Sequence, residues 1–208
     1  MNFNVRETPG NTDWFVHDRF GMFIHWGLYS LPARHEWVMN HERITNEDYK
    51  KYFDHFDPDL YDPKEWAEYA KKAGMKYALL TTKHHEGFCL FDSEYTDFKA
   101  TNTKAGRDLV KEYVDAFRAE GIKIGFYYSL LDWHHPDFTI DYHHPRRDDT
   151  KEEIERFNKG RDMKRYAQYI RDQVTELLTN YGKIDLLWFD FSYVKGKDDW
   201  ESEKLIKL

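Results

Sequence analysis

The sequence predicts an α/β fold with a parallel sheet, arranged as a truncated or half (β/α) barrel of the TIM type with about four βα units. Four short runs, at residues 20–27, 76–84, 122–129 and 185–192, are almost continuously apolar, aromatic or β-branched. Such runs are typical of parallel strands that are covered on both faces. Segments with helical periodicity separate the runs, and this alternation indicates βαβ units with right-handed crossovers. The length of 208 residues favours a single catalytic domain, residues 1–208.

The segment between the first two runs carries clear helix signals. Asp62 can cap a helix, Pro63 suits its first position, and Gly74 can end it. A second helix is expected over 107–121, where an apolar stripe precedes Gly121.

The longest helical pattern is expected between residues 150 and 181. Thr150 and Glu153 form a capping-box pattern at its start, and Gly160 is a candidate interruption. The tail, 198–208, reads as the opening of one more short helix. The segments that follow the first three strands, 28–61, 85–106 and 130–149, are long and are expected to be loops. Because α/β folds place their sites beyond the carboxyl ends of parallel strands, function is expected there.

Composition excludes several classes of function. The net charge is −7 and no basic run dominates, so nucleic-acid binding is not expected. No apolar run approaches the roughly 20 residues that span a bilayer. The first ten residues lack the features of a signal peptide, and Cys89 is the only cysteine, which suits a reducing compartment. We therefore expect a soluble, cytoplasmic protein.

Polar residues stand at the carboxyl end of every expected strand. They are His25 on the first, His84 and His85 on the second, Tyr127 and Tyr128 on the third, and Asp190 on the fourth. In a barrel these residues would converge on one pocket at the top face. Strand alternation separates the two tyrosines: Tyr127 shares a face with Ser129, while Tyr128 is expected to pack under a helix.

This set of side chains suits a hydroxyl-rich ligand. Imidazole and phenol groups donate to and accept from sugar hydroxyls, and Trp26, Trp37 or Trp133 could stack on the apolar face of a sugar ring. Asp190 lies in an otherwise apolar stretch, LLWFDFS, where an unpaired carboxylate is costly. Such a carboxylate can serve as the nucleophile of glycosidic chemistry.

The motifs resemble a known family. FGMFIHWG (20–27), HEW (35–37), KHHEGF (83–88), FYYSLLDW (126–133) and LLWFDFS (186–192) are similar, in order and spacing, to the N-terminal half of the α-L-fucosidases of glycoside hydrolase family 29. The resemblance extends from about Trp14 to Trp200. One departure is Glu86, where many relatives have aspartate.

The resemblance implies a retaining hydrolase that releases α-L-fucose from fucosylated glycans through a covalent glycosyl-enzyme on Asp190. It implies that His25, His84, His85 and Tyr127 bind fucose and that Glu36 and Trp37 form a carboxylate–tryptophan pair at the sugar site. Trp133, as a candidate stacking ring, is also expected to bind the sugar. No cofactor and no metal are expected.

The second carboxyl group is the open question. Retaining hydrolysis needs two carboxyl groups about 5–5.5 Å apart, and in the family the general acid/base comes from segments beyond the nucleophile strand. Glu36 is the first candidate for this role, and Glu86 and Asp132 come next.

A sheet of four strands does not close a barrel that normally has eight. The first and fourth strands would be edges with unpaired backbone groups. We therefore expect a homo-oligomer, with a dimer as the simplest form.

Two alternatives stay open at this point. The chain could be an inactive or weakly active relative that binds fucose and oligomerises. It could also be a metal-dependent barrel hydrolase, because HHPDFTIDYHHP (134–145) places two histidine pairs in one loop, although no HExxH motif is present.

Overall fold

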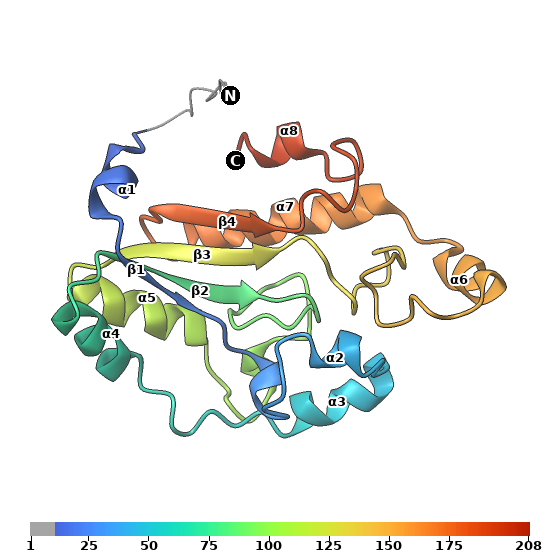
Figure 1. Cartoon of the computed structure of the whole chain (residues 1–208), viewed down its shortest axis with the longest axis horizontal. Coiled ribbons are helices and arrows are strands. Elements are labelled where there is room, and N and C mark those ends of the chain that lie inside the picture. Colours follow the sequence, from blue (N-terminus) through green and yellow to red (C-terminus); the bar gives the residue numbers. More distant parts are fainter. Residues whose placement is uncertain (1–10) are drawn as a thin grey trace.

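The computed structural model describes residues 11–208 and contains one parallel sheet of four strands (Figure 1). The strands are β1 (Gly21–Ile24), β2 (Tyr77–Lys83), β3 (Lys123–Ser129) and β4 (Leu186–Asp190). They lie in the order β1-β2-β3-β4, so each strand pairs with the next one along the chain. The predicted α/β class, the parallel sheet and the partial barrel of four units are confirmed.

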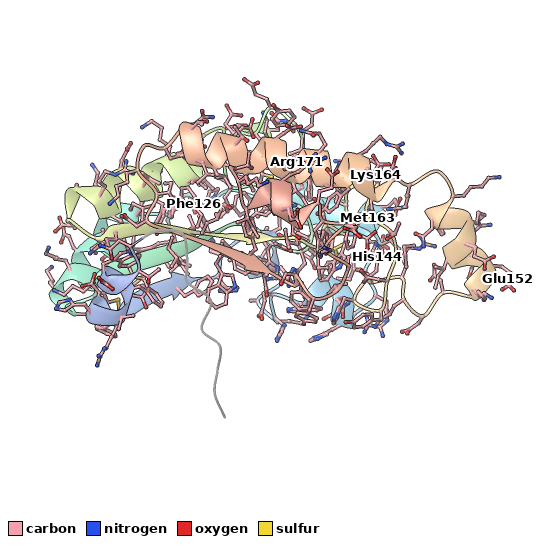
Figure 2. The ribbon with its side chains drawn as sticks, turned by 90° about the horizontal axis from the view of Figure 1, so that it is seen from above. Phe126, His144, Glu152, Met163, Lys164 and Arg171 are labelled. Atoms are coloured by element: carbon pink, nitrogen blue, oxygen red, sulfur yellow. The ribbon has the colours of Figure 1, made fainter. Side chains whose placement is uncertain are left out.

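Helices α5 (Leu109–Ala119) and α7 (Met163–Thr179) cover one face of this sheet (Figure 2). The Tyr113 hydroxyl of α5 donates a hydrogen bond of 2.6 Å to the Ala78 carbonyl of β2. The Tyr128 hydroxyl of β3 donates to Gln173 of α7 at 2.8 Å, and both residues are fully buried. Tyr128 therefore packs under a helix, as strand alternation predicted.

The expected cap at Asp62 begins a helix where the sequence placed it, and Asp108 caps the next helix although the sequence analysis did not name it. The Asp62 carboxylate accepts hydrogen bonds from the backbone of Lys64 and Glu65, and Pro63 opens α4 (Pro63–Lys72). At α5, the Asp108 side chain accepts from the Lys111 backbone. These side chains satisfy N–H groups that have no partner inside the helix.

The long pattern after residue 150 forms two helices rather than one. Helix α6 (Lys151–Asn158) starts with the Thr150–Glu153 capping box, and α7 starts at Met163. Gly160 lies between them with a φ of +86°, a conformation that glycine adopts without steric cost. The candidate interruption at this glycine is confirmed.

The expectation that 28–61 is a loop is wrong in part. The segment contains a 3₁₀ turn, η1 (Leu28–Ser30), and helices α2 (Val38–His41) and α3 (Asn46–Asp54). Thr45 caps α3, since its hydroxyl accepts from the Asp48 backbone at 3.1 Å. The remaining short elements are α1 (Asp13–Asp18), η2 (Ala100–Asn102) and α8 (Ser202–Leu205), the last of which lies in the tail where a short helix was expected.

The two outer strands are less buried than the sequence predicted. Strands β2 and β3 are buried almost throughout, but β1 and β4 contain no fully buried residue. Within residues 11–208 nothing pairs with their outer edges, and Phe23 and Trp188 are 41 % and 49 % exposed on the face away from α5 and α7. The sequences of β1 and β4 are apolar on both faces, although the described chain covers only one face of each strand.

All four strands point toward the same end of the molecule, where α2 and α3 lie (Figure 1). This end carries the long segments that were expected to hold the site. In residues 11–208 no helix is both long and apolar enough to cross a bilayer. The decapeptide on which the absence of a signal peptide was argued lies outside the described residues.

Candidate active site

The strand ends bring the predicted histidines and Tyr127 into one cluster. The ring centres of His25 and His84 are 5.7 Å apart, and Tyr127 lies 5.3 Å from the first and 5.7 Å from the second. The sheet register pairs Ser129 with Asp190, which sets the carboxylate at the same level. Residues from four separate strands thus meet at one edge of the sheet.

Two hydrogen bonds hold the Asp190 carboxylate. The Tyr127 hydroxyl donates to Oδ2 at 2.7 Å, and the backbone N–H of Phe191 donates to Oδ1 at 2.9 Å. Burial, followed by the nearby charge of Asp190, raises the pKa of Tyr127 above its ordinary value. The phenol therefore keeps its proton and acts as a donor, so Asp190 is oriented as its acceptor.

Phe191 is a site residue that the sequence did not reveal. Its φ is +63°, in a region that a bulky residue rarely adopts. The conformation directs its backbone N–H to Asp190, while its ring packs 4.8 Å from His85 and 5.3 Å from Trp37. Strained backbone of this kind is found where the surrounding structure enforces it, often at functional sites.

A chain of hydrogen bonds sets the protonation of His85. The Ser129 hydroxyl donates to the Leu131 carbonyl at 2.8 Å, so at 2.7 Å it accepts from the Nδ1–H of His85. Burial, and then repulsion from His84 and other cations, hold the pKa of His85 well below its usual range. The ring is therefore neutral, and its Nε2 is a buried acceptor without a partner in the described chain. A ligand hydroxyl would satisfy this atom.

His84 reaches the cluster because β2 is irregular at its end. The register with β3 shifts between Thr81 and Lys83, which turns Lys83 toward α7 and His84 toward His25. The Nδ1 of His84 lies 3.4 Å from Glu86 Oε2, too long for a good hydrogen bond, and neither atom has another partner in the described residues.

Glu36 stands next to the same cluster. Its side chain is 38 % exposed, and its Oε2 lies 3.4 Å from His35 Nδ1. Burial and then His84 lower the pKa of His25, whereas the charges of Glu36 and Asp190 oppose this shift. Both carboxylates therefore lie within electrostatic range of one imidazole.

The two predicted tryptophans occupy different depths. Trp37 is half-buried and lies 4.7 Å from His85 and 5.5 Å from Trp133 between ring centres. Trp133 is only 1 % exposed, and its indole N–H has no partner in the described structure. Trp37 consequently offers a ring to a ligand, while Trp133 packs behind Trp37 and His85.

The four histidines of the segment 134–145 point to different neighbours. His134 stacks on Phe98, His135 contacts Tyr169, and His143 lies against Phe191. His144 is buried beneath the loop. In the part of the chain that the structure describes, no three His, Cys, Asp or Glu side chains gather as a metal site would require.

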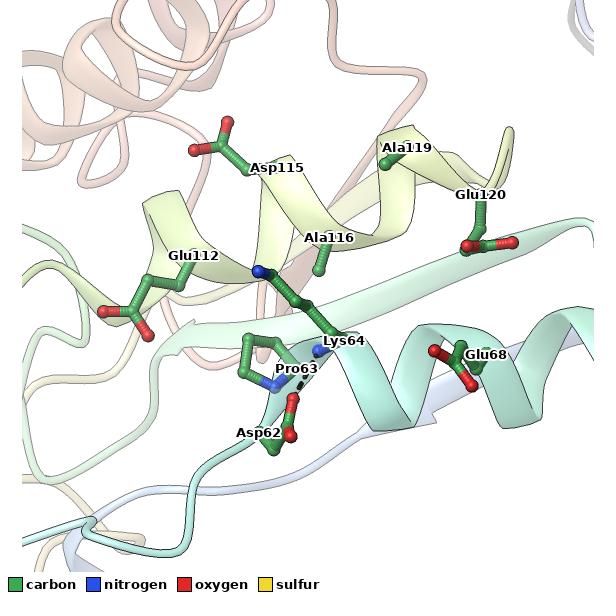
Figure 3. Close-up of a pocket in the computed structure, with 9 residues that line it drawn as sticks. All are labelled: Asp62, Pro63, Lys64, Glu68, Glu112, Asp115, Ala116, Ala119 and Glu120. Carbon is green, nitrogen blue, oxygen red and sulfur yellow. Dashed lines mark hydrogen bonds between the residues drawn. The ribbon is translucent and has the colours of Figure 1, made fainter.

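A groove in the helix layer lies away from the strand ends. This groove, of about 670 Å³, runs between α4 and α5 (Figure 3). Its lining contains Lys64 and several acidic side chains, among them Glu68, Glu112 and Glu120. None of the predicted site residues lines this groove.

The turn that carries the histidine pair depends on Gly87. Its φ is +85°, and a Cβ at this position would lie 2.2 Å from Asp132 Oδ1. We expect Gly87→Ala to lower the free energy of unfolding by about 1–2 kcal/mol for the left-handed backbone and by about 1–3 kcal/mol more for the steric clash. Urea unfolding measures the loss.

Gly74→Ala is the matched control. Gly74 has a nearly identical φ of +84°, but a Cβ there would meet nothing within 4 Å. Only the backbone cost should apply, about 1–2 kcal/mol. Equal losses for the two variants would contradict the proposed contact between this turn and Asp132.

The chain matches proteins of one family in sequence and in structure. The family model described as alpha-L-fucosidase matches residues 3–208. Human tissue alpha-L-fucosidase is 31 % identical over 93 % of this chain and 42 % of that enzyme. The alpha-L-fucosidase of Dictyostelium discoideum is 28 % identical over 98 % of this chain and 46 % of its own length.

Solved structures agree. Alpha-L-fucosidase isoenzyme 1 from Paenibacillus thiaminolyticus is 61 % identical, with a TM-score of 0.88, over 94 % of this chain and 46 % of that chain. A family 29 fucosidase from Bacteroides thetaiotaomicron, trapped as a covalent intermediate with 2-fluoro-fucosyl fluoride, is 33 % identical with a TM-score of 0.81. It is covered over 48 % of its length, so the chain spans less than half of each of these relatives.

Proposed function

The chain belongs to the α-L-fucosidase family, and on this premise we propose that it acts as a retaining glycoside hydrolase that releases α-L-fucose from fucosylated glycans. The observation that carries the proposal is the Asp190 carboxylate, held by Tyr127 and Phe191 at the end of β4 beside three histidines. A carboxylate held in place beside unpaired hydroxyl-binding groups is what attack on a sugar requires.

The proposed reaction has two steps. An Asp190 oxygen attacks the anomeric carbon as the bond from that carbon to the leaving oxygen breaks, and an acid protonates the leaving oxygen. Water then attacks the resulting fucosyl ester, loses a proton to the same group now acting as a base, and releases fucose with its configuration retained. The Tyr127 hydroxyl keeps Asp190 oriented between the steps.

Fucose fits the chemistry of the open face. His25, His84 and His85 offer donors and acceptors to its hydroxyls, and Trp37 offers a ring to its apolar side. The ring centres of Phe23 and Trp188 lie 5.8 Å apart on the sheet face away from α5 and α7, and both rings are exposed. The Phe23 ring lies next to the Tyr127 ring, and Trp188 is the partner of Tyr127 in the sheet register. We expect this aromatic wall to contact the methyl group that distinguishes fucose from hexoses with a hydroxymethyl group.

The nucleophile can be tested without an acid. Fluoride leaves without protonation, so 2-fluoro-fucosyl fluoride should label Asp190 even if the acid is absent or weak. Intact mass spectrometry should show one adduct, and peptide mapping should locate it on Asp190. No adduct, or an adduct elsewhere, would refute the assignment of Asp190.

Glu36 is the first candidate for the acid. We expect Glu36→Gln to reduce kcat for a fucosyl disaccharide by roughly 10²–10⁴-fold, the usual contribution of general acid catalysis. An aryl fucoside with a good leaving group should lose far less, and Glu68→Gln, on the exposed side of α4, should change neither rate. Equal losses on both substrates would assign Glu36 to binding alone.

The binding-only alternative has a distinct outcome. Fucose binding by calorimetry, with neither turnover of an aryl fucoside nor the covalent adduct, would favour an inactive relative that binds fucose. We further propose that two copies associate through the open edges of β1 and β4. An aryl fucoside assay across the peaks of a size-exclusion column tests activity and assembly together, and a stable, folded monomer at micromolar concentration would refute association.

A further inference from the structure

We propose that the buried ion pair between Lys83 and Asp132 is a positioning device, which fixes the histidine pair and Trp133 in the geometry that binds the sugar. The inference rests on the proposed function, because it deepens the description of the same site. Neither Lys83 nor Asp132 is among the residues proposed above to react with the sugar or to bind it.

The pair is enclosed by the fold. Lys83 Nζ lies 3.1 Å from Asp132 Oδ2, and the two side chains are 0 % and 2 % exposed. The ammonium also lies 4.4 Å from the ring centre of Tyr128 and 5.3 Å from that of Tyr169. Charges removed from water in this way require a partner, so each side chain fixes the place of the other.

Asp132 is occupied at both oxygens. Its Oδ1 accepts hydrogen bonds from the backbone N–H groups of His134 and His135, at 3.0 and 2.8 Å. Burial by itself would raise the pKa of Asp132, but attraction to Lys83, and then to His135 and His134, outweighs burial and leaves this pKa below its ordinary value. An ionised, enclosed carboxylate of this kind does not supply a proton, so we assign Asp132 to positioning rather than to the acid role considered from the sequence.

The ion pair joins the two segments that carry the site. Lys83 directly precedes His84 and His85, and Asp132 directly precedes Trp133. The Trp133 backbone N–H donates to the His85 carbonyl at 2.8 Å, so the segments are also joined beside the pair. A shift of about 1 Å at His85, or at Trp133 packed behind it, would misplace the imidazole that binds the sugar, and such shifts can cost as much as 10²-fold.

The experiment replaces both charges together. In the double variant Lys83→Met, Asp132→Asn, no charge is stranded, and the asparagine oxygen can still accept from the backbone of residues 134 and 135. We expect the folded double variant to bind L-fucose with a Kd raised roughly tenfold or more. The ¹⁵N NMR signals of the His85 ring should move as well. The control, Arg171→Met with Glu201→Gln, removes a part-buried ion pair elsewhere and should leave both readouts unchanged.

Each outcome decides the proposal. A folded double variant with the wild-type Kd and unchanged His85 signals would overturn it, and so would failure to fold, which would assign the pair to general stability. If the wild-type chain binds no fucose, the proposed function fails, but the His85 signals still test the positioning role. Signals that shift in the double variant and not in the control would support the positioning role.

Discussion

Replacement of Asp190 by asparagine is expected to reduce kcat for an aryl α-L-fucoside by at least about 10³-fold, the scale on which loss of a nucleophile is felt. Asparagine keeps the size of the side chain, its single oxygen can still accept from the Phe191 backbone, and its NH2 group can donate to the Tyr127 hydroxyl oxygen, so the fold should survive. What disappears is the negative charge and the ability to form an ester. Steady-state kinetics measures the loss, and the mass adduct from 2-fluoro-fucosyl fluoride should vanish with it.

Asp115→Asn is the matched control. Asp115 lies on the exposed side of α5, where it pairs with Lys111. The same chemical change there should leave kcat and labelling unchanged. Retention of more than a tenth of the wild-type rate by Asp190→Asn would contradict the nucleophile assignment, and the carboxylate would then be one that only orients Tyr127 or the sugar.

The parts of the fold that the sequence predicted are those with local causes. Continuous apolar runs mark the strands, and Asp62, Pro63 and Gly160 act on the backbone within a few residues of themselves. The convergence of His25 and Asp190 was predictable because parallel strands end at one edge of a sheet. Helix α3 has an equally local cap at Thr45, so the sequence contained the signal for this helix and our prediction overlooked it.

The rest of the site depends on contacts between distant residues. Ser129 sets the tautomer of His85 across 44 positions, and Lys83 meets Asp132 across 49. Nothing local marks Phe191 for a left-handed backbone, because that conformation usually calls for glycine or asparagine. The irregularity at the end of β2 likewise arises from pairing with β3. These features determine the protonation and the orientation of the side chains in the site.

The histidines also predict a strong loss of stability in acid. Burial is the first cause of a lowered pKa at His25, His85, His135, His143 and His144. Each is held neutral in the folded protein and has a pKa near 6.5 when unfolded. The unfolded chain therefore binds more protons below this pH, and the free energy of unfolding must fall as the pH drops from about 6.5.

His144 offers the sharpest test of this effect. Burial, and then repulsion from Arg161, lower the pKa of His144 to about 4, so this residue alone should remove about 3 kcal/mol between pH 6.5 and 4. Asparagine can replace its Nδ1 as the acceptor for the Arg146 backbone without titrating. Urea unfolding of His144→Asn should therefore show a shallower pH dependence than the wild type, whereas His55→Asn, at an exposed position, should follow the wild type. Parallel curves for all three proteins would mean that His144 is not held neutral in the folded protein.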